Sequence, residues 1–543
     1  MSVRILRPLP RQVTRLLSVL ALVAWIVTMG VVIDRSYLQA SSRNLATDLA
    51  RYGTTAQWRG VYYRGEKIGF TVSQVQAHDD GYELQEDGRL QFSLLGATTA
   101  AILKTTAQVD RSFALKSFDF SLDPGTGPMS IKGRLDGLDL SLEIGTASGS
   151  RNETRHLAEA PALMLSVGRR LAADGLVAGT KKEWIVFDPA TMKNAPVNIA
   201  VRKREVVRAG GRIIPAFKVE MTFSGLTTTS WITDTGEIVR EESPMGLITV
   251  VETQEEATAL AVSNRMQEDM LQAAAIVPHM ARGQRIAEPR DVKKLRLRIR
   301  GVDLSKADVA GSGQSVDGEF VELIDPRDLA ASAHPGDLDR YLRAEPFIES
   351  DAPEIKAEAD RMVAGVTGVR NRAERLTREV NALIDKKPTV SLPSALEVLR
   401  TKVGDCNEHT VLYVALARSL GIPARINVGV VYVHGAFYYH AWPEVYIDEG
   451  NKRGMWLPVD PTLNQFPTDT THLRLARGGH DQQAAILPMI GKTEIFVLAV
   501  DVVPNSTPIL VGRQAGDPTP LAIDLPRRQP CGCWASPCSG GGR

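Results

Sequence analysis

The pattern that most constrains the fold lies between Trp58 and Glu255, where short runs of alternating apolar and polar residues recur. Most of these runs end in Gly, Asp or Pro, as at the turn formed by residues 64–66. A period of two places every second side chain on one face of a strand, and such residues close hairpins. The region therefore predicts a large twisted antiparallel sheet, curled around one helix over 160–173. Because no catalytic residue types cluster in it, we expect a structural or ligand-gripping role.

Residues 403–463 carry the residue types of a nucleophilic site. Asp405 and Cys406 precede an apolar pattern at helical spacing that stops at Gly421 and Pro423, which predicts the sulfur in the first turn of a helix. The unpaired N–H groups and the dipole of a helix start favour a thiolate, the nucleophilic form of cysteine. No other cysteine precedes residue 531, which excludes a disulfide-built fold.

Two further residues suit a site around this cysteine. His440 lies on an alternating run over 437–447, so a strand could aim its imidazole at the helix start. Asp460 follows a short strand pattern over 455–459 and precedes Pro461, which favours extended geometry. Such a carboxylate could accept the second ring N–H of His440 and stabilise its protonated form.

Each of these residues also has a plainer interpretation, as a buried cysteine, a sheet histidine or a turn aspartate. The ordered trio favours the functional one. His409 is a rival base, but it shares the helix of the cysteine and is expected to act only indirectly. Trp442 and Trp456 are expected to pack around the site, whereas Glu444 could equally be a solvated strand residue.

The chain then resembles a known family. The runs G-D-C-N-E-H, A-L-A-R-x-x-G-I-P-A-R, Y-Y-H-A-W-x-E-V and W-x-x-V-D-P-T occur in this order within 348–469, and they resemble the transglutaminase-like superfamily in its bacterial form. The resemblance implies a papain-like core of helices on an antiparallel sheet. It implies Cys406 as nucleophile, His440 as general base and acid, and Asp460 as the residue that orients the histidine.

One departure concerns the oxyanion. Animal enzymes of this superfamily place a stabilising tryptophan a few dozen residues before the cysteine, and this chain has none between Trp231 and Cys406. The backbone N–H of Cys406 is one candidate donor. The second donor is not assigned.

The N-terminal region predicts a membrane anchor. Residues 16–33 are apolar and uncharged over about the length that spans a bilayer, and four arginines precede them. The positive-inside rule then keeps the N-terminus in the cytoplasm and sends the remainder across the inner membrane as a single-pass, periplasm-facing protein. A cleaved signal peptide is the alternative, although no good cleavage site follows the run.

Composition and motifs limit the classes of partner, cofactor and metal that this chain is expected to bind. Lysine and arginine number 64 against 63 acidic residues, a net charge of +1 that argues against a nucleic-acid partner. No phosphate-binding loop and no metal-ligand pattern occurs, so no cofactor or metal is expected. Three tail cysteines lack zinc spacing, and a local disulfide plus one spare thiol is expected (Cys531, Cys533 and Cys538).

Together these features predict an α+β chain of five parts. They are a cytoplasmic N-terminus and anchor (1–35), a β-rich domain (36–255), a connecting helix and small β unit (256–345), a transglutaminase-like domain (346–500) and a tail (501–543). A helix is expected over 254–276, a strand over 292–300, one or two helices over 357–384, and a single strand after Asp469 that completes the sheet.

The predicted function is acyl transfer or hydrolysis at amide or peptide bonds of protein or cell-wall peptide substrates. The sequence does not choose between hydrolysis and crosslinking, because access of water to the acyl-enzyme decides it. The alternative is a non-catalytic peptide-binding or assembly module of the cell envelope. Oligomeric state is left open.

Overall fold

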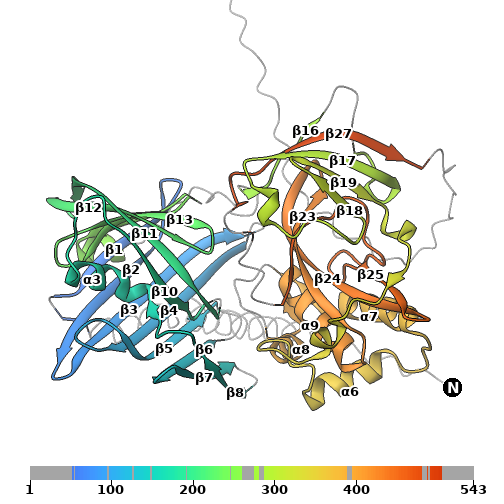
Figure 1. Ribbon diagram of the computed structural model, residues 1–543, viewed down its shortest axis with the longest axis horizontal. Coiled ribbons are helices and arrows are strands. Elements are labelled where there is room, and N and C mark those ends of the chain that lie inside the picture. Colours follow the sequence, from blue (N-terminus) through green and yellow to red (C-terminus); the bar gives the residue numbers. More distant parts are fainter. Residues whose placement is uncertain are drawn as a thin grey trace, which may run out of the picture. The chain divides into compact units, whose positions relative to one another are not determined.

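The computed structural model describes residues 52–503, except 54, 95–96, 125–127, 147–148, 191, 245, 260–273, 281–285, 388–393, 480–485 and 487–488. Within these ranges the chain is mixed α+β, with many strands and few helices (Figure 1). No helix in the described part is long and apolar enough to cross a membrane. The apolar run 16–33 and the tail cysteines lie outside the described residues, so the anchor and the disulfide stay predictions.

The alternating region forms one sheet of 15 strands among the described residues. Its first eight strands follow one another outward from β1, and its later strands follow one another on the other side, where β15 pairs with β1. The expected antiparallel sheet is confirmed, with one parallel pair between β9 and β10. Its strands are β1 (Gln57–Tyr63), β2 (Glu66–His78), β3 (Gly81–Leu94), β4 (Ala97–Val109), β5 (Leu115–Asp123), β6 (Met129–Asp136), β7 (Asp139–Thr146), β8 (Gly149–His156), β9 (Ala162–Leu163), β10 (Lys181–Asp188), β11 (Lys193–Ala209), β12 (Arg212–Phe223), β13 (Leu226–Ile232), β14 (Ile238–Glu242) and β15 (Leu247–Glu252).

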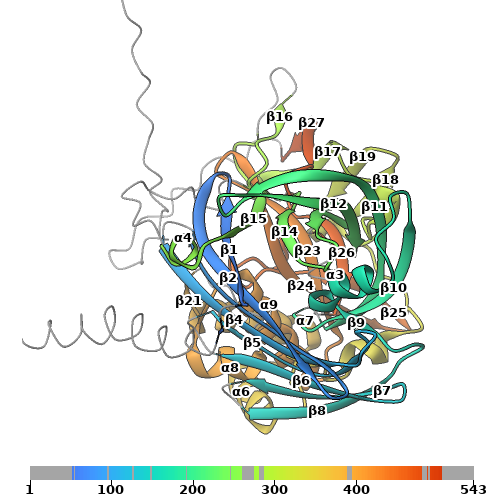
Figure 2. The ribbon, with the colours of Figure 1, turned by 90° about the vertical axis from the view of Figure 1, so that its left-hand side faces the viewer.

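This sheet curls, and a helix lies inside its curve (Figure 2). The helix is α3 (Met164–Ala173), which buries Val167 and Leu171 against β10 and β11. It begins four residues later than the sequence pattern predicts, because residues 162–163 pair with β10 as β9. The helix therefore shares an apolar core with this part of the curled sheet.

A five-stranded antiparallel sheet and four helices make up the region of the cysteine. The strand order is β20 (Ser332–Ala333), β25 (Arg453–Pro458), β24 (Ala436–Gly450), β23 (Ala424–Val433) and β26 (Leu473–Gly478). The helices are α6 (Pro353–Met362), α7 (Val369–Leu383), α8 (Ala395–Thr401) and α9 (Cys406–Ser419). The predicted break near 365–368 is confirmed between α6 and α7.

Helix α9 is the core of this region. Its residues 411–417 are all fully buried, because the helix lies between strands β23 and β24 on one side and α6, α7 and α8 on the other. An apolar helix buried on all sides is fixed in position by packing. The side chains of its first turn are therefore held in a fixed position against the sheet.

A second five-stranded sheet adjoins this core, in the order β16 (His279–Met280), β27 (Glu494–Val502), β17 (Val292–Arg300), β19 (Phe320–Ile324) and β18 (Gln314–Asp317). A two-stranded pair also joins β21 (Asp385–Lys386) to β22 (Val403–Gly404). The strand expected over 292–300 is confirmed as β17. The single strand expected after Asp469 is wrong, because β26 completes the sheet of the cysteine region whereas β27 pairs with β17.

The helix expected over 254–276 is also only partly correct. The structure has α4 (Gln254–Thr258), which a capping box at Thr253 starts and a non-helical Ala259 ends. Residues 260–273 lie outside the described part. Ile276 itself is extended and exchanges two backbone hydrogen bonds of 2.8 Å with Phe437 on β24, so the helix does not reach it.

Candidate active site

Cys406 is the first residue of α9, as predicted, and the residue as a whole is partly exposed although its thiol is buried. A capping box fixes this helix start: the Asp405 side chain accepts the N–H of Asn407 at 2.9 Å, and Glu408 accepts the N–H of Asp405 at 2.8 Å. Gly404 is required just before it, because a Cβ there would lie 2.2 Å from the Cβ of Glu408. The G-D-C-N-E run therefore determines where the sulfur sits.

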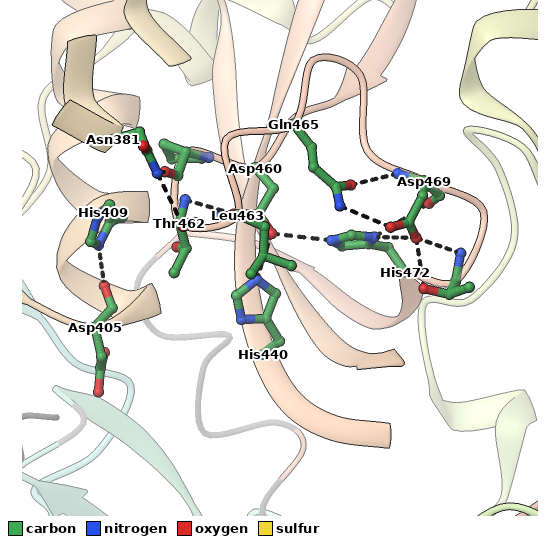
Figure 3. A network of polar contacts seen from close by, with 12 residues as sticks. Asn381, Asp405, His409, His440, Asp460, Thr462, Leu463, Gln465, Asp469 and His472 are labelled. Atoms are coloured by element: carbon green, nitrogen blue, oxygen red, sulfur yellow. Dashed lines mark hydrogen bonds and ion pairs between the residues drawn. The ribbon is translucent and has the colours of Figure 1, made fainter. Parts of the chain in front are cut away.

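In the structure, the predicted histidine and aspartate are hydrogen-bonded to each other. His440 lies on β24, and its Nε2 is 2.8 Å from Oδ2 of Asp460, which is fully buried (Figure 3). The other carboxylate oxygen of Asp460 accepts the backbone N–H groups of Thr462 and Leu463 at 2.7 and 3.0 Å. This contact leaves Nδ1 as the ring nitrogen of His440 that is free for a reacting group.

The cysteine lies beside the same strand. Its sulfur is hydrogen-bonded by the backbone of Ala441, the residue that follows His440. Helix α9, whose first residue is Cys406, packs along β24, the strand that carries His440. The three residues predicted from sequence thus belong to one neighbourhood built by α9, β24 and the end of β25.

The net shift in the pKa of the thiol is opposite to the one predicted from the helix start alone. Burial raises the pKa of the Cys406 thiol well above its usual value, and the negative charge of Asp405 raises it further. Glu408 and Asp460 add to the shift, whereas the hydrogen bond from Ala441 opposes it. Asp405 and Glu408 cap the helix, and their negative charges offset the positive end of the helix dipole. The free thiol is therefore neutral and needs a base.

Removing the Asp405 charge tests this electrostatic balance. Asp405→Asn keeps an equally good N-cap but removes the negative charge closest in sequence to the sulfur. We expect the pH midpoint of Cys406 alkylation by iodoacetamide to fall by about half a unit to one unit, and alkylation at neutral pH to rise roughly three- to tenfold. The measurement uses protein whose tail cysteines are serine. Exposed Asp351→Asn is the control, and an unmoved midpoint in Asp405→Asn contradicts the assignment.

Burial of Asp460 opposes its ionisation, but two histidines outweigh burial and hold the pKa of this carboxyl well below its usual range. One is His440. The other, His472, was not predicted, and its Nε2 lies 3.1 Å from the same oxygen of Asp460. Asp469 follows on its far side, 3.2 Å from Nδ1 of His472. The sequence offered only a weak signal for this pair, an aspartate three residues before a histidine at the start of an alternating run.

A helix far away in sequence steadies the loop after Asp460. Asn381 on α7 donates to the backbone carbonyls of Pro461 and Thr462 at 2.6 and 3.1 Å. This loop supplies the two N–H groups that Asp460 accepts. Helix α7 therefore helps to orient the carboxylate.

His409, the rival base, already has a hydrogen-bond partner. His409 is fully buried, and its Nδ1 donates to the backbone carbonyl of Asp405 at 2.6 Å. Burial lowers the pKa of His409, so the ring is a neutral part of the helix start. The expected indirect role agrees with these contacts.

The aromatic residues pack as expected, but Glu444 does not lie in solvent. Trp442 is 1% exposed and stacks on His440, with ring centroids 5.9 Å apart. Glu444 is fully buried, 2.7 Å from Arg425 and 3.6 Å from Arg474. The solvated interpretation of Glu444 is therefore wrong, because two buried arginines pair with it.

His440, Asp460 and His472 bring their donor atoms within 4.8 Å of one another. Both rings approach one carboxylate oxygen at hydrogen-bonding distance, and Asp469 takes the outer nitrogen of His472. The geometry is that of a hydrogen-bonded chain of alternating charges. We assign no metal to it.

Comparison with known proteins gives one family match. Residues 356–461 match the sequence model of the transglutaminase-like superfamily. A search of curated proteins finds no match to the chain.

Solved structures give distant likenesses. A protein from Cytophaga hutchinsonii, provisionally assigned as a cysteine protease, is 19% identical, with coverage of 39% of this chain and 87% of its own and a TM-score of 0.26. A β-barrel-like protein of unknown function from Brucella abortus is 10% identical, with coverage of 36% and 95% and a TM-score of 0.29. Such low scores carry no argument.

The matched range begins in α6 and ends just after Asp460, so it contains Cys406, His440 and the helix-on-sheet core. The order of sequence runs and the observed core agree with this match. Residues 356–461 are therefore part of a domain of the transglutaminase-like superfamily.

Proposed function

We propose that this chain is a membrane-anchored cysteine acyltransferase or peptidase in which Cys406, His440 and Asp460 act as a catalytic triad. The observation that carries the proposal is the buried 2.8 Å hydrogen bond from His440 to Asp460, next to a cysteine at a helix start. A carboxylate on Nε2 fixes the tautomer that leaves Nδ1 able to accept a proton. A base held in this way can activate a cysteine for acyl transfer.

The first half of the reaction forms a thioester. Because the thiol is neutral at rest, Nδ1 of His440 takes its proton as the sulfur attacks a carboxamide or peptide carbonyl. The backbone N–H of Cys406, at the first helical position, is the donor we assign to the resulting oxyanion. The C–N bond then breaks, and His440 returns the proton to the leaving amine.

The second half resolves the thioester. Attack by water releases a carboxylic acid and restores the thiol, whereas attack by an amine forms a new amide bond. His440 takes the proton of either attacking group. We propose protein or cell-wall peptides as substrates and a periplasmic location, on the basis of the apolar run 16–33 and the arginines before it.

The test is to trap the acyl-enzyme. Full-length protein is mixed with carboxamide and peptide substrates, quenched in acid, and measured by intact mass and peptide mapping. We expect a thioester on Cys406 and none in Cys406→Ala.

The tail thiols provide the matched control. Protein with serine at positions 531, 533 and 538 should form the same adduct, because the tail takes no part in the chemistry. An adduct that survives in Cys406→Ala, or its absence from wild type with every substrate class, contradicts the proposal. The second outcome favours the peptide-binding alternative.

A further inference from the structure

His472 is the residue just before β26 and has a side chain only 2% exposed. Its place depends on Gly429 of β23, where a Cβ would lie 2.0 Å from the carbonyl oxygen of Leu473. Glycine thus allows β26 to approach β23 closely enough to set His472 beside Asp460. The triad described above does not use this histidine.

Both ring nitrogens of His472 meet carboxylates. Nε2 is 3.1 Å from Oδ2 of Asp460, and Nδ1 is 3.2 Å from Oδ1 of Asp469. A carboxylate accepts and does not donate, so both nitrogens must carry a proton. Burial favours the neutral ring, but the charge of Asp469 and the bonds to both carboxylates outweigh it and raise the pKa of His472 to about 9.

Asp469 is held as an anion by its own loop. Its Oδ1 accepts the N–H and the hydroxyl of Thr471 at 2.9 and 2.6 Å, and its Oδ2 accepts from Gln465 at 2.9 Å. These bonds and the charge of His472 offset the burial of Asp469, and its pKa lies well below its usual range. In space, the buried side chains follow one another in the order His440, Asp460, His472 and Asp469 (Figure 3). Asp460 and Asp469 carry negative charges, and His472 carries a positive one.

We propose that His472 is a positioning residue of this site, a buried imidazolium that orients Asp460 and offsets its charge, so that His440 stays free to take the proton of Cys406. This inference rests on the proposed function. An isolated buried carboxylate would favour a His440 that is protonated before the reaction and unable to act as base. The positive charge of His472, which approaches the same oxygen of Asp460, makes protonation of His440 before the reaction less favourable.

Other charges near His472 do not replace this effect. Asp460, Asp469 and His440 are the titratable groups that face its ring. Arg474 follows on β26, but its guanidinium donates to the carbonyls of residues 309–311 and pairs with Glu444. Lys386 of β21 interacts electrostatically with Asp460, from an exposed position.

Substrate does not reach His472. The ring borders a cavity of about 20 Å³, which has room for water but not for a peptide side chain. Asn427, Trp442 and Thr468 line the same cavity. Each has buried side-chain polar atoms with no hydrogen-bond partner in the described part of the chain. The surroundings of His472 are polar and too small for a peptide side chain, so His472 acts on the reaction through Asp460.

The test is the pH dependence of acyl-enzyme formation in His472→Gln. Glutamine keeps a donor for Asp460 but not the charge. The two imidazole rings are 5.9 Å apart, and unit charges at that distance correspond to roughly two pH units at an effective dielectric constant of about 20. We expect the acid limb of the rate profile to move up by about one to two units, with a rate close to wild type above it.

A merely structural role would lower the rate equally at every pH, and that result overturns the inference, as does an unmoved limb or one moved to lower pH. Asp469→Asn should show the same displacement, because His472 then loses its proton at lower pH. His156→Gln is the matched control, since His156 pairs with Asp139 at 2.7 Å but is 76% exposed, and its profile should equal wild type.

A second readout does not depend on activity. Because the pKa of His472 is raised in the folded state, its contribution to stability is complete below about 6.5 and is lost as pH rises through about 9. Wild type should lose thermal stability across this range by more than His472→Gln does, and equal losses overturn the buried cation. If wild type forms no acyl-enzyme, the proposed function and the positioning role of His472 are both contradicted. The stability comparison still shows whether His472 is positively charged in the folded protein.

Discussion

Asp460→Asn is expected to lower the rate of acyl-enzyme formation by about 10⁴-fold, the scale of loss when the aspartate of a serine-protease triad becomes asparagine. The two oxygens of Asp460 have separate partners. One accepts backbone N–H groups from Thr462 and Leu463, and the other faces His440 and His472. An asparagine satisfies the backbone pair only with its carbonyl oxygen.

Its NH₂ group then points at two ring nitrogens that need an acceptor. His440 can remain bonded only by turning Nε2 into an acceptor, which moves its proton to Nδ1. Nδ1 is the nitrogen that must accept the thiol proton, so the base is in the wrong tautomer. His472 would at the same time lose one of its two anionic partners.

Single-turnover acylation, measured by intact mass across pH, checks this expectation. Thermal melting of Asp460→Asn establishes that the variant is folded before its rate is interpreted. His156→Gln, which changes an exposed histidine–aspartate pair, should keep the wild-type rate. A rate for Asp460→Asn within tenfold of wild type contradicts the role of Asp460.

Glu444→Gln is expected to lower the free energy of unfolding by about 3–5 kcal/mol, the cost of removing one partner from a buried ion pair. Glu444 is fully buried on β24, 2.7 Å from Arg425 and 3.6 Å from Arg474. Glutamine has nearly the same shape but leaves both guanidinium groups without their anion. The stacking of Arg425 on Trp456, at 3.8 Å from the ring centroid, cannot replace that charge.

Urea unfolding followed by tryptophan fluorescence measures the effect, because Trp442 and Trp456 lie in this region. The matched control is Glu322→Gln, which removes the partner of Lys294 from an exposed pair at 2.8 Å. An exposed pair contributes about 0–1 kcal/mol. Equal losses in both variants would show that the Glu444 cluster is no more important than a surface contact.

Much of the local structure near the site could be predicted from sequence, because it depends on neighbours in the chain. The helical spacing after Cys406 and the stop at Gly421 predicted α9, and the alternating run around His440 predicted its place on β24. The helical stretch expected over 357–384, which forms α6 and α7, and the strand β17 were predicted for the same reason. Periodicity reports on nearest neighbours, and these elements depend on little else.

Partners at long range were predicted less well. One strand was expected after Asp469, but the structure has two, and the second, β27, pairs with β17 about 200 positions earlier. Glu444 looked like a solvated strand residue, since nothing in its local sequence reveals that Arg425 and Arg474 converge on it. The helix predicted over 254–276 is only partly present: α4 ends at Thr258, and Ile276 bonds to β24 as an extended residue.

The sequence by itself determined the nucleophile candidate, its helix start, the histidine strand and the aspartate at a strand end, because each depends on residues within one turn or one strand. Only the tertiary structure decided the charges. It showed that burial and Asp405 raise the pKa of Cys406 and that His472 and Asp469 extend the chain beyond Asp460. The physical reason is that a pKa depends on distances through space and on burial, and neither is encoded by spacing along the chain.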